Sequence, residues 1–384
     1  MTKGSRVLGA AISLLLLSVV LSACGAVPVA ETWPGLIVAD EAVYVISGSP
    51  QQVYILDAKT GTQKATFVPQ GAQRGIVYWS PVTVGGGLAF IGFAESQSRT
   101  AGLYAFDPGT GQELWHVPAQ DLILPAPTYA DGVVYFGDSN GNVYAVDVET
   151  KSIKPGWSFQ SKAPIWASPL VASGRVYVAA MDHHLYCLDA ATGEKLWDTK
   201  LGGAMAAQPT LDASRGTLYV GTFDGQVYAI RADSGEIIEG FHFEAKGWIW
   251  SEVLVVNGQL YVTSLDGKLY ALDPSTGEVM PPYPYNSAES SAEIPDQKDS
   301  IRAAPVQAGE SILVATESGR VIAVKDAKRQ WFWPSGLPQT AIYTTPVVYA
   351  GTIYVVLQNG SVQTLNSETG ALGWAFTSPV PASK

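Results

Sequence analysis

Few residues of this sequence could carry covalent or metal chemistry. They are two cysteines, Cys24 and Cys187, and one pair of adjacent histidines, His183 and His184. Successive residues of a strand point to opposite faces, so the two imidazoles would chelate one metal ion poorly. We interpret them as exposed turn residues that follow Asp182. The short motifs of a serine nucleophile, a phosphate-binding loop or a metal site do not occur in the sequence, so we expect no catalytic residue and no bound metal.

Cys24 follows an N-terminal segment with the composition of an export signal. Lys3 and Arg6 form a positive start, and residues 7–20 form an apolar run that is short for a transmembrane helix. The tetrapeptide Leu-Ser-Ala-Cys that ends at Cys24 resembles the bacterial lipobox, whose cysteine sulfur receives a diacylglycerol before cleavage. The pattern predicts a signal peptide of residues 1–23 and a mature N-terminus at Cys24 that carries acyl chains such as palmitate and anchors the protein to a membrane.

The charge balance is acidic. The formal net charge is -11, and only 15% of the residues are charged, whereas 47% are hydrophobic. Phosphate binding needs clustered lysine and arginine, so we expect no nucleic-acid partner. The apolar fraction is large enough for an extensive core.

A repeated pattern of short strands sets the fold. Each copy contains a strand such as residues 134–137, a turn rich in Asp, Asn and Gly, a second strand such as residues 143–147, and then Thr-Gly and a tryptophan. Periods of about 40–50 residues made of short alternating strands are typical of propeller blades. One polar residue ends the second strand of each of eight copies: Asp57, Asp107, Asp147, Asp189, Arg231, Asp273, Lys325 and Asn366.

We therefore predict an all-β protein, an eight-bladed β-propeller of four-stranded antiparallel blades. Two insertions interrupt the period, at residues 94–101 and 281–300, and the second is rich in proline, serine and acidic residues, so it should form a mobile surface loop. The predicted boundaries are a signal peptide at 1–23, a tether at 24–32, the propeller at 33–377 and a C-terminal tail at 378–384.

Residues 105–115, Ala-Phe-Asp-Pro-Gly-Thr-Gly-Gln-Glu-Leu-Trp, resemble the tryptophan-docking motif of the PQQ-repeat propellers, Ala-x-Asp-x-x-Thr-Gly-x-x-x-Trp. Residues 187–197 match with Cys187 in the alanine position, where a small buried residue packs. In this family the indole stacks on the Thr-Gly peptide of a neighbouring blade. The resemblance covers residues 33–376. It implies a structural docking role for five tryptophans: Trp115, Trp157, Trp197, Trp333 and Trp374.

Two groups within this family have different functions. Quinoprotein dehydrogenases hold PQQ and calcium at the propeller centre, against a disulfide between adjacent cysteines. BamB-type outer-membrane assembly proteins are lipoproteins with one propeller. This chain has no adjacent cysteines, and it is similar to the second group in its lipobox and size. Binding of PQQ with calcium therefore stays an alternative, although the adjacent cysteines that are its most specific marker do not occur in the sequence.

The resemblance implies a membrane-anchored, non-catalytic scaffold that binds envelope proteins or peptides, as a monomer or within a hetero-complex. Its membrane would be the outer membrane of a two-membrane envelope, or otherwise the outer face of the plasma membrane. Outer-membrane β-barrel assembly is one such role. The alternatives are a PQQ-binding quinoprotein or another envelope enzyme, and a cell-surface sensor or polysaccharide binder.

One position of the innermost strands is rich in aromatic residues. If it faces the central channel, it forms a ring able to bind a peptide or a planar ligand; if it faces between the blades, it belongs to the core, because one pleat step reverses every side chain. Counted back from the second strand of each repeat, the eight residues are Trp33, Tyr78, Leu124, Trp166, Ala206, Trp250, Arg302 and Tyr343.

The sequence also indicates how the ring closes. The first and last repeats each contain a full set of strands, so we predict eight whole blades with no strand shared between the termini. Closure would then rest on apolar side chains such as Trp374 and Phe376, with no backbone hydrogen bonds across the seam. We expect blades 1 and 8 to be the least protected from hydrogen exchange.

Overall fold

The computed structural model places residues 33–384 in one compact unit, which is described here by itself. Cys24, Trp33, the predicted signal peptide and the predicted tether lie outside the described residues. Within the described part of the chain, no helix is long and apolar enough to cross a membrane. The structure describes residues 35–47, 51–69, 76–95, 100–290, 299–334 and 340–378.

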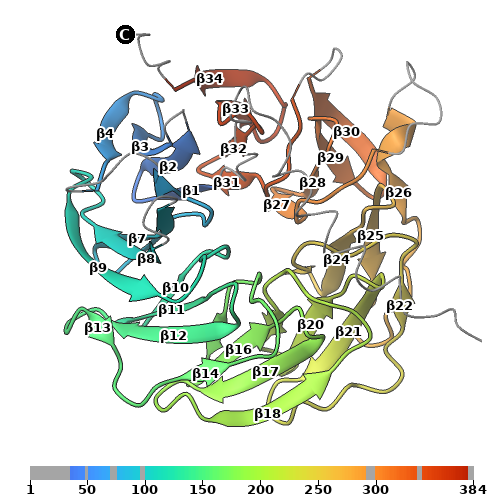
Figure 1. Ribbon diagram of the computed structural model, residues 1–384. Coiled ribbons are helices and arrows are strands. Elements are labelled where there is room, and N and C mark those ends of the chain that lie inside the picture. Colours follow the sequence, from blue (N-terminus) through green and yellow to red (C-terminus); the bar gives the residue numbers. More distant parts are fainter. Residues whose placement is uncertain are drawn as a thin grey trace, which may run out of the picture. The chain divides into compact units, whose positions relative to one another are not determined.

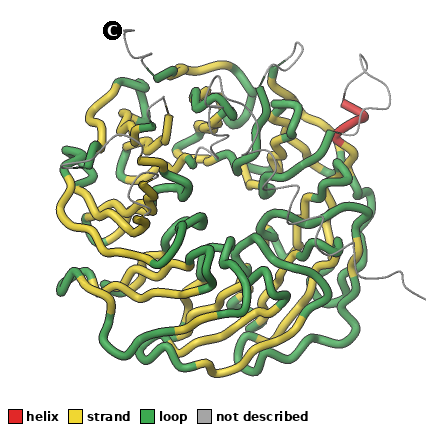
Figure 2. The backbone as a smooth tube through the Cα atoms, in the orientation of Figure 1, coloured by secondary structure: helices red, strands yellow, loops and turns green. Residues whose placement is uncertain are grey.

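Eight antiparallel sheets follow one another along this unit and surround its centre, with the first strand of each sheet innermost (Figure 1). This arrangement confirms the predicted eight-bladed β-propeller. Strands and turns make up almost all of the described residues, and the short 3-10 helix η1 (Ser287–Ser290) is the one helix among them (Figure 2).

The first four blades run from Leu36 to Lys200. Blades 2 and 3 have a fifth strand because β5 and β6 both pair with β7, and β13 and β14 both pair with β12. Their strands are β1 (Leu36–Ala39), β2 (Ala42–Ser47), β3 (Gln52–Asp57) and β4 (Gln63–Phe67); β5 (Ile76–Val77), β6 (Thr83–Gly85), β7 (Leu88–Glu95), β8 (Thr100–Phe106) and β9 (Glu113–Ala119); β10 (Thr128–Ala130), β11 (Val133–Gly137), β12 (Asn142–Asp147), β13 (Ser152–Ile153) and β14 (Phe159–Gln160); and β15 (Leu170–Ala172), β16 (Arg175–Ala179), β17 (His184–Asp189) and β18 (Lys195–Lys200).

The last four blades run from Thr210 to Phe376. Their strands are β19 (Thr210–Asp212), β20 (Thr217–Gly221), β21 (Gln226–Arg231) and β22 (Phe243–Glu244); β23 (Leu254–Val256), β24 (Gln259–Thr263), β25 (Lys268–Leu272) and β26 (Tyr285–Asn286); β27 (Val306–Ala308), β28 (Ser311–Ala315), β29 (Val321–Lys325) and β30 (Lys328–Trp333); and β31 (Val347–Tyr349), β32 (Thr352–Val356), β33 (Val362–Asn366) and β34 (Leu372–Phe376).

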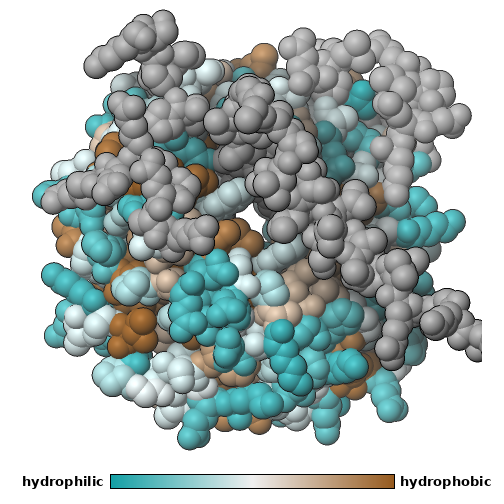
Figure 3. Space-filling view, viewed as in Figure 1, coloured by the Kyte–Doolittle hydropathy of each residue, from teal (hydrophilic) through white to brown (hydrophobic). Residues whose placement is uncertain are grey.

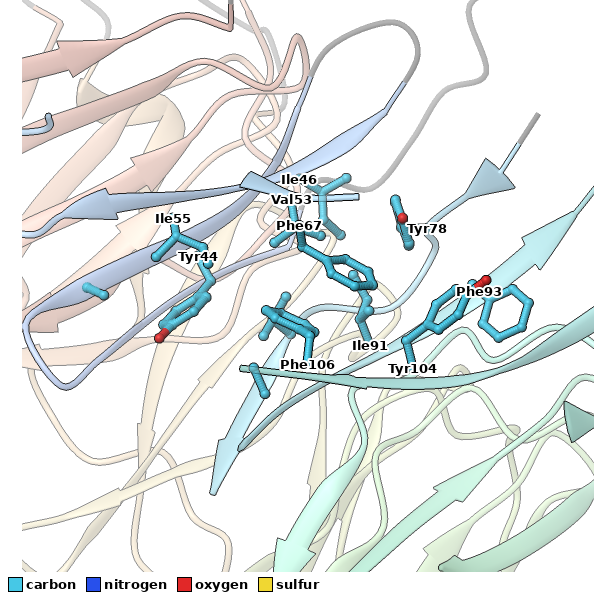
Figure 4. Close-up of a cluster of buried hydrophobic side chains, with 13 residues drawn as sticks. Tyr44, Ile46, Val53, Ile55, Phe67, Tyr78, Ile91, Phe93, Tyr104 and Phe106 are labelled. Atoms are coloured by element: carbon cyan, nitrogen blue, oxygen red, sulfur yellow. The ribbon is translucent and has the colours of Figure 1, made fainter. Parts of the chain in front are cut away.

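The core lies between neighbouring blades. The second and third strands of each blade are buried on both faces, because each blade packs against one neighbour on either side. Between blades 1 and 2, Phe67 stacks on Phe106 with ring centroids 4.3 Å apart and meets Tyr104 edge-on at 5.6 Å (Figure 4). Such aromatic pairs contribute about 0.5–1.5 kcal/mol each beyond the burial of their area.

Among the described residues, blades 8 and 1 share no strand, which agrees with the predicted closure; residues 24–34 lie outside the described part of the chain. Each of these blades is a complete sheet made from its own strands. The predicted closure by apolar contacts alone was wrong, because two hydrogen bonds also cross this seam. The indole Nε1 of Trp374 and the hydroxyl of Tyr354 both donate to the carbonyl oxygen of Ala58, over 3.0 and 2.9 Å. Tyr54 and Phe376 add a ring contact at 5.2 Å.

Candidate functional site

The Asp-x-x-Thr-Gly turn links the third and fourth strands of four blades, which are blades 1, 2, 4 and 6. In blade 2, the Asp107 carboxylate accepts hydrogen bonds from the Gly109 and Thr110 backbone N–H groups and from the Thr110 hydroxyl, over 2.7–2.9 Å. These donors favour the ionised carboxylate and lower the pKa of Asp107. The same turn, with a nearby Lys64, lowers the pKa of Asp57 to about 2. The acidic residues that mark the period therefore stabilise turns.

The glycine of this turn receives the docking tryptophan of the preceding blade. Trp374 covers Gly61, and a Cβ atom at Gly61 would lie 2.5 Å from the indole. Gly61 also has a positive φ of 71°, which an alanine there would adopt only with strain. Trp157 and Trp197 cover Gly193 and Gly235 in the same way.

Trp115 also docks on its neighbour, and Lys151 replaces the usual glycine there. Trp115 packs at the junction of blades 2 and 3 with Phe90, at 5.9 Å between centroids, and with Val148 of the turn. Lys151 follows Thr150 in that turn and has a positive φ of 56°.

The docking residue of blade 7 is Trp331, and the prediction of Trp333 was wrong. Trp331 pairs with Ala323 and covers Gly370 of blade 8, where a Cβ atom would lie 2.6 Å from its ring. The turn of blade 7 is two residues shorter than the family motif, so the alanine-to-tryptophan spacing is eight residues instead of ten. Trp333 follows on the same face of β30 and packs against the same apolar cluster.

Phe241 and Tyr283 occupy the docking position of blades 5 and 6, and the sequence analysis missed both. Phe241 lies 5.7 Å from Tyr219, and Tyr283 lies 5.8 Å from Tyr261; the corresponding pair of Trp157 with Tyr135 is at 5.8 Å. In these three blades the outer strand is interrupted, which lengthens the spacing from the alanine to twelve residues. That common spacing was the signal that could have identified them. Since Tyr285 and Asn286 form β26, the predicted loop at 281–300 begins with ordered blade structure.

A tyrosine hydroxyl repeats at the same junctions. Tyr135 and Tyr177 on the second strands donate to the carbonyl oxygens of Ala190 and Ala232 in the next blade, both over 3.1 Å. At the junction of blades 4 and 5, Arg175 Nη1 donates to the same Ala232 oxygen over 2.7 Å. Both lone pairs of that oxygen are therefore occupied, and the buried Nε1 of Trp197 has no hydrogen-bond partner among the described residues.

Cys187 and the histidine pair have structural positions. Cys187 is fully buried beside Trp197, and burial raises the pKa of its thiol to about 12, so it stays protonated and unreactive. His183 lies in the predicted turn with a φ of 71°, but it is half-buried and not exposed as predicted. His184 was predicted to be an exposed turn residue, but it begins β17, is half-buried, and its Nδ1 lies 2.9 Å from Asp198 Oδ2.

The described part of the predicted aromatic ring, apart from Tyr78, precedes the inner strands around the central opening, which is visible in the space-filling view (Figure 3). Its residues stand four positions before the inner strands, in segments fixed by backbone hydrogen bonds from the nearby turns, such as Leu265 N to Trp248 O over 3.0 Å. They are half-buried and alternate with fully buried residues such as Ile165 and Ile249. We define the channel mouth by the described residues of this position: Trp79, Leu124, Trp166, Ala206, Trp250, Arg302 and Tyr343.

In blade 2 the mouth residue is Trp79, and the assignment of Tyr78 was wrong. β6 begins at Thr83, which pairs with Phe90, so the position four residues earlier is Trp79. Tyr78 is 1% exposed and packs in the core between blades 1 and 2. An error of one residue in counting back from the second strand turned the side chain from the channel to the core.

A continuous stack of planar groups crosses the channel mouth. Phe223 lies between Trp248 and Trp250, with centroids 5.0 and 4.8 Å apart and ring planes within 17°. The Arg302 guanidinium lies 4.6 Å from the Trp250 ring and 5.3 Å from the Tyr343 ring. We call these five residues the mouth stack: Trp248, Phe223, Trp250, Arg302 and Tyr343.

Arg302 is held in the mouth stack by Glu317. Its Nε and Nη2 both lie 2.8 Å from Glu317 Oε1. Two charge-assisted contacts fix the guanidinium plane and compensate its charge. Trp248, at the outer end of the stack, is 50% exposed. The arrangement is an amphipathic surface of aromatic rings and one compensated guanidinium.

These observations define the protein as an eight-bladed β-propeller whose blades are joined by docked aromatic residues and whose channel mouth carries a stack of aromatic side chains with one arginine. The family described as "Outer membrane protein assembly factor BamB" matches residues 69–154, 99–241 and 287–383. The chain belongs to this family.

Individual relatives agree with this assignment. The BamB of Nitrosomonas eutropha is 26% identical over 95 residues, and a lanthanide-dependent methanol dehydrogenase of Methylacidiphilum fumariolicum is 27% identical over 121 residues. The matches cover 25% and 27% of this chain but only 22% and 20% of those proteins. The crystal structure of BamB from Moraxella catarrhalis is similar with a TM-score of 0.67 and 18% identity, over 86% of this chain and 92% of that one, which shows the shared fold.

Proposed function

We propose that this protein is a non-catalytic, lipid-anchored scaffold of the cell envelope that binds polypeptide segments at its channel mouth. By its family membership, we propose outer-membrane β-barrel assembly as the process that it serves. Its partners are envelope proteins or peptides, bound by a monomer or within a hetero-complex. The mouth stack is the observation that carries the proposal.

The mouth stack has the properties of an anchor for a polypeptide. Aromatic and arginine side chains dominate the energetics of protein interfaces, because they bury a large area and few of their torsions must be fixed on binding. Here Trp250 and Arg302 are already held by neighbours, so little further ordering opposes binding. Trp248 offers a half-exposed ring on which an incoming side chain can stack.

The test is site-specific crosslinking in intact cells. A photoreactive phenylalanine derivative in place of Trp248 should crosslink to envelope proteins several-fold more than the same residue in place of Ser214. Ser214 is the control because it is exposed in the β19–β20 turn, at the other end of the strands. Equal, background-level crosslinking from both positions would refute binding at the channel mouth.

The lipid anchor is a second part of the proposal and rests on the lipobox-like sequence at Cys24. Cys24→Ser removes the sulfur that receives the diacylglycerol, so the variant should accumulate unprocessed or free in the soluble export fraction. Fractionation followed by immunoblotting measures this. Gly25 and Ala26 follow the cysteine and lack the aspartate that commonly signals retention at an inner membrane, so in a two-membrane cell we place the protein at the outer one. Normal processing and membrane retention of the variant would contradict the anchor.

We further propose that the protein works without PQQ, although a methanol dehydrogenase is among its relatives. Two observations support this. Among the residues that the structure describes, no three His, Cys, Asp or Glu side chains lie close enough to share a metal ion. The space between the Trp250 and Tyr343 rings is taken by Arg302.

Thermal unfolding tests the quinone alternative. A ligand that binds only the folded state must raise the temperature of the unfolding midpoint. At a ligand concentration of 100 times the dissociation constant, it adds about 2.7 kcal/mol to the free energy of unfolding. We expect PQQ with calcium to leave the midpoint unchanged, with calcium alone as the control. A midpoint that rises and saturates with PQQ would establish the quinoprotein alternative.

A further inference from the structure

We propose that the channel binds a cationic side chain of the partner polypeptide, with the ammonium or guanidinium group held by the carboxylate of Glu252 inside the channel. This inference rests on the proposed polypeptide binding at the channel mouth. It adds the chemistry that the partner segment must carry. Four features of the channel support it, and they concern the position of Glu252, its surroundings, the compensation of Arg302 and the number of acidic groups.

Glu252 lies just inside the mouth. It follows Trp250 by two residues, and side chains alternate along this segment, with Ser251 and Val253 buried at 8% and 3% exposure. Glu252 therefore shares the channel-facing side with Trp250, and its side chain is exposed. Its carboxylate makes no hydrogen bond or ion pair within the described part of the chain, so it is free to accept a ligand.

Glu252 is the one charged side chain at its level of the channel. The position two residues after each mouth residue, together with Gly35 at the equivalent place in blade 1, defines a second ring, and all eight of its members are described. The other seven are small or uncharged, so no cation of the protein neutralises Glu252 at this level. The eight are Gly35, Pro81, Ala126, Ser168, Gln208, Glu252, Ala304 and Thr345.

The channel walls make this carboxylate a stronger attractor for a cation than one on the outer surface. The surrounding blades displace bulk water and raise the pKa of Glu252. The cause is desolvation of the charged form, which a bound cation would relieve. In such surroundings an ion pair is screened less than at an open surface.

The neighbouring guanidinium does not oppose a second cation. Arg302 is compensated by Glu317, with two nitrogens 2.8 Å from one oxygen. The half-exposed ring of Trp248 lies at the outer end of the mouth stack, and aromatic faces attract ammonium and guanidinium groups. The net charge of -11 favours the approach of a basic segment.

The chemistry favours an organic cation over a metal ion. Calcium takes six to eight oxygen ligands, usually with several carboxylates. The second ring offers one carboxylate, and in the described residues no metal-binding group of three is present. One carboxylate beneath aromatic walls suits the end of a lysine or arginine side chain, whose alkyl stem would lie along the mouth.

Calorimetric titration of the full chain in detergent tests this inference. The probes are two capped peptides, acetyl-Trp-Lys-Trp-amide and acetyl-Trp-norleucine-Trp-amide, which differ only in the ammonium group. We expect the lysine peptide to bind about tenfold more tightly. Glu252→Gln should reduce this preference to less than about twofold and leave the affinity for the norleucine peptide unchanged. Glu194→Gln, at an exposed turn of blade 4, is the matched control and should keep the preference.

The possible failures are distinguishable. Equal affinities for the two peptides, or a lysine preference that survives Glu252→Gln, would overturn the role of Glu252. If both peptides then bind equally and Trp248→Ala weakens both, binding at the mouth stands without the cation site. If neither peptide binds, the cation site is wrong, and the crosslinking experiment decides separately on polypeptide binding.

Discussion

Trp331→Ala is expected to lower the free energy of unfolding by about 3 kcal/mol, and Trp333→Ala by about 1 kcal/mol. Truncation of a fully buried tryptophan costs about 3–5 kcal/mol, and Trp331 is half-buried, so the lower end applies. Trp331 covers Gly370 of blade 8. Truncation of its indole therefore leaves a cavity at the junction of blades 7 and 8. Trp333 lies at the end of β30 and only borders the same cluster.

Urea denaturation of the two variants, followed by tryptophan fluorescence and circular dichroism, measures the difference. The pair is well matched, because both changes remove one half-buried indole from one strand. A larger loss for Trp333→Ala would show that the ten-residue spacing of the family motif decides docking. Our assignment by strand register would then be wrong.

This pair illustrates what the sequence alone could predict. The period and the strand pattern were enough for the fold, because each blade repeats the same alternation of apolar residues and the same turns. The motif also identified the docking role of Trp115, Trp157, Trp197 and Trp374. Each of them lies ten or twelve residues after the alanine position of the motif.

The remaining errors have one physical origin, which is the variable length of hairpins. The turn of blade 7 is two residues shorter than the motif, and this moved docking from Trp333 to Trp331. In blade 2, the predicted register was wrong by one residue. It therefore assigned Tyr78, a core residue, to the channel position that Trp79 occupies. Register is decided by hydrogen-bonded pairing between strands, which composition and periodicity do not specify at single-residue precision.

The mouth stack could not be predicted for a different reason. Its members come from two kinds of position: Trp248, Trp250, Arg302 and Tyr343 precede inner strands, and Phe223 lies in a turn of blade 5. Glu317, which holds Arg302, lies in a turn of blade 7. The sequence indicated Trp250 and Arg302 by their equivalent places in the repeat. Their neighbours become visible only when the turns of adjacent blades are brought to the same end of the channel.

Trp374→Ala should open the ring at the seam between blades 8 and 1. The chain connects every other pair of neighbouring blades, so those junctions are held by covalent continuity as well as by docking. Among the described residues, the polar contacts across the seam are the two hydrogen bonds from the Tyr354 and Trp374 side chains to the Ala58 oxygen. Trp374→Ala removes one of these bonds and the cover of Gly61. We expect a loss of about 3 kcal/mol of stability.

Hydrogen exchange can locate that loss. In the unmodified protein we expect blades 1 and 8 to exchange faster than the others, since end units of a stacked array open first. Trp374→Ala should accelerate exchange further in these two blades, by about two orders of magnitude for 3 kcal/mol if opening is local. Trp331→Ala is the control, because it removes the same type of contact between blades 7 and 8, which the chain still joins. Its acceleration should not extend to blade 1. If the two variants accelerated exchange equally and in all blades, the ring would open as one cooperative unit, and the seam would be no weaker than the junctions that the chain crosses.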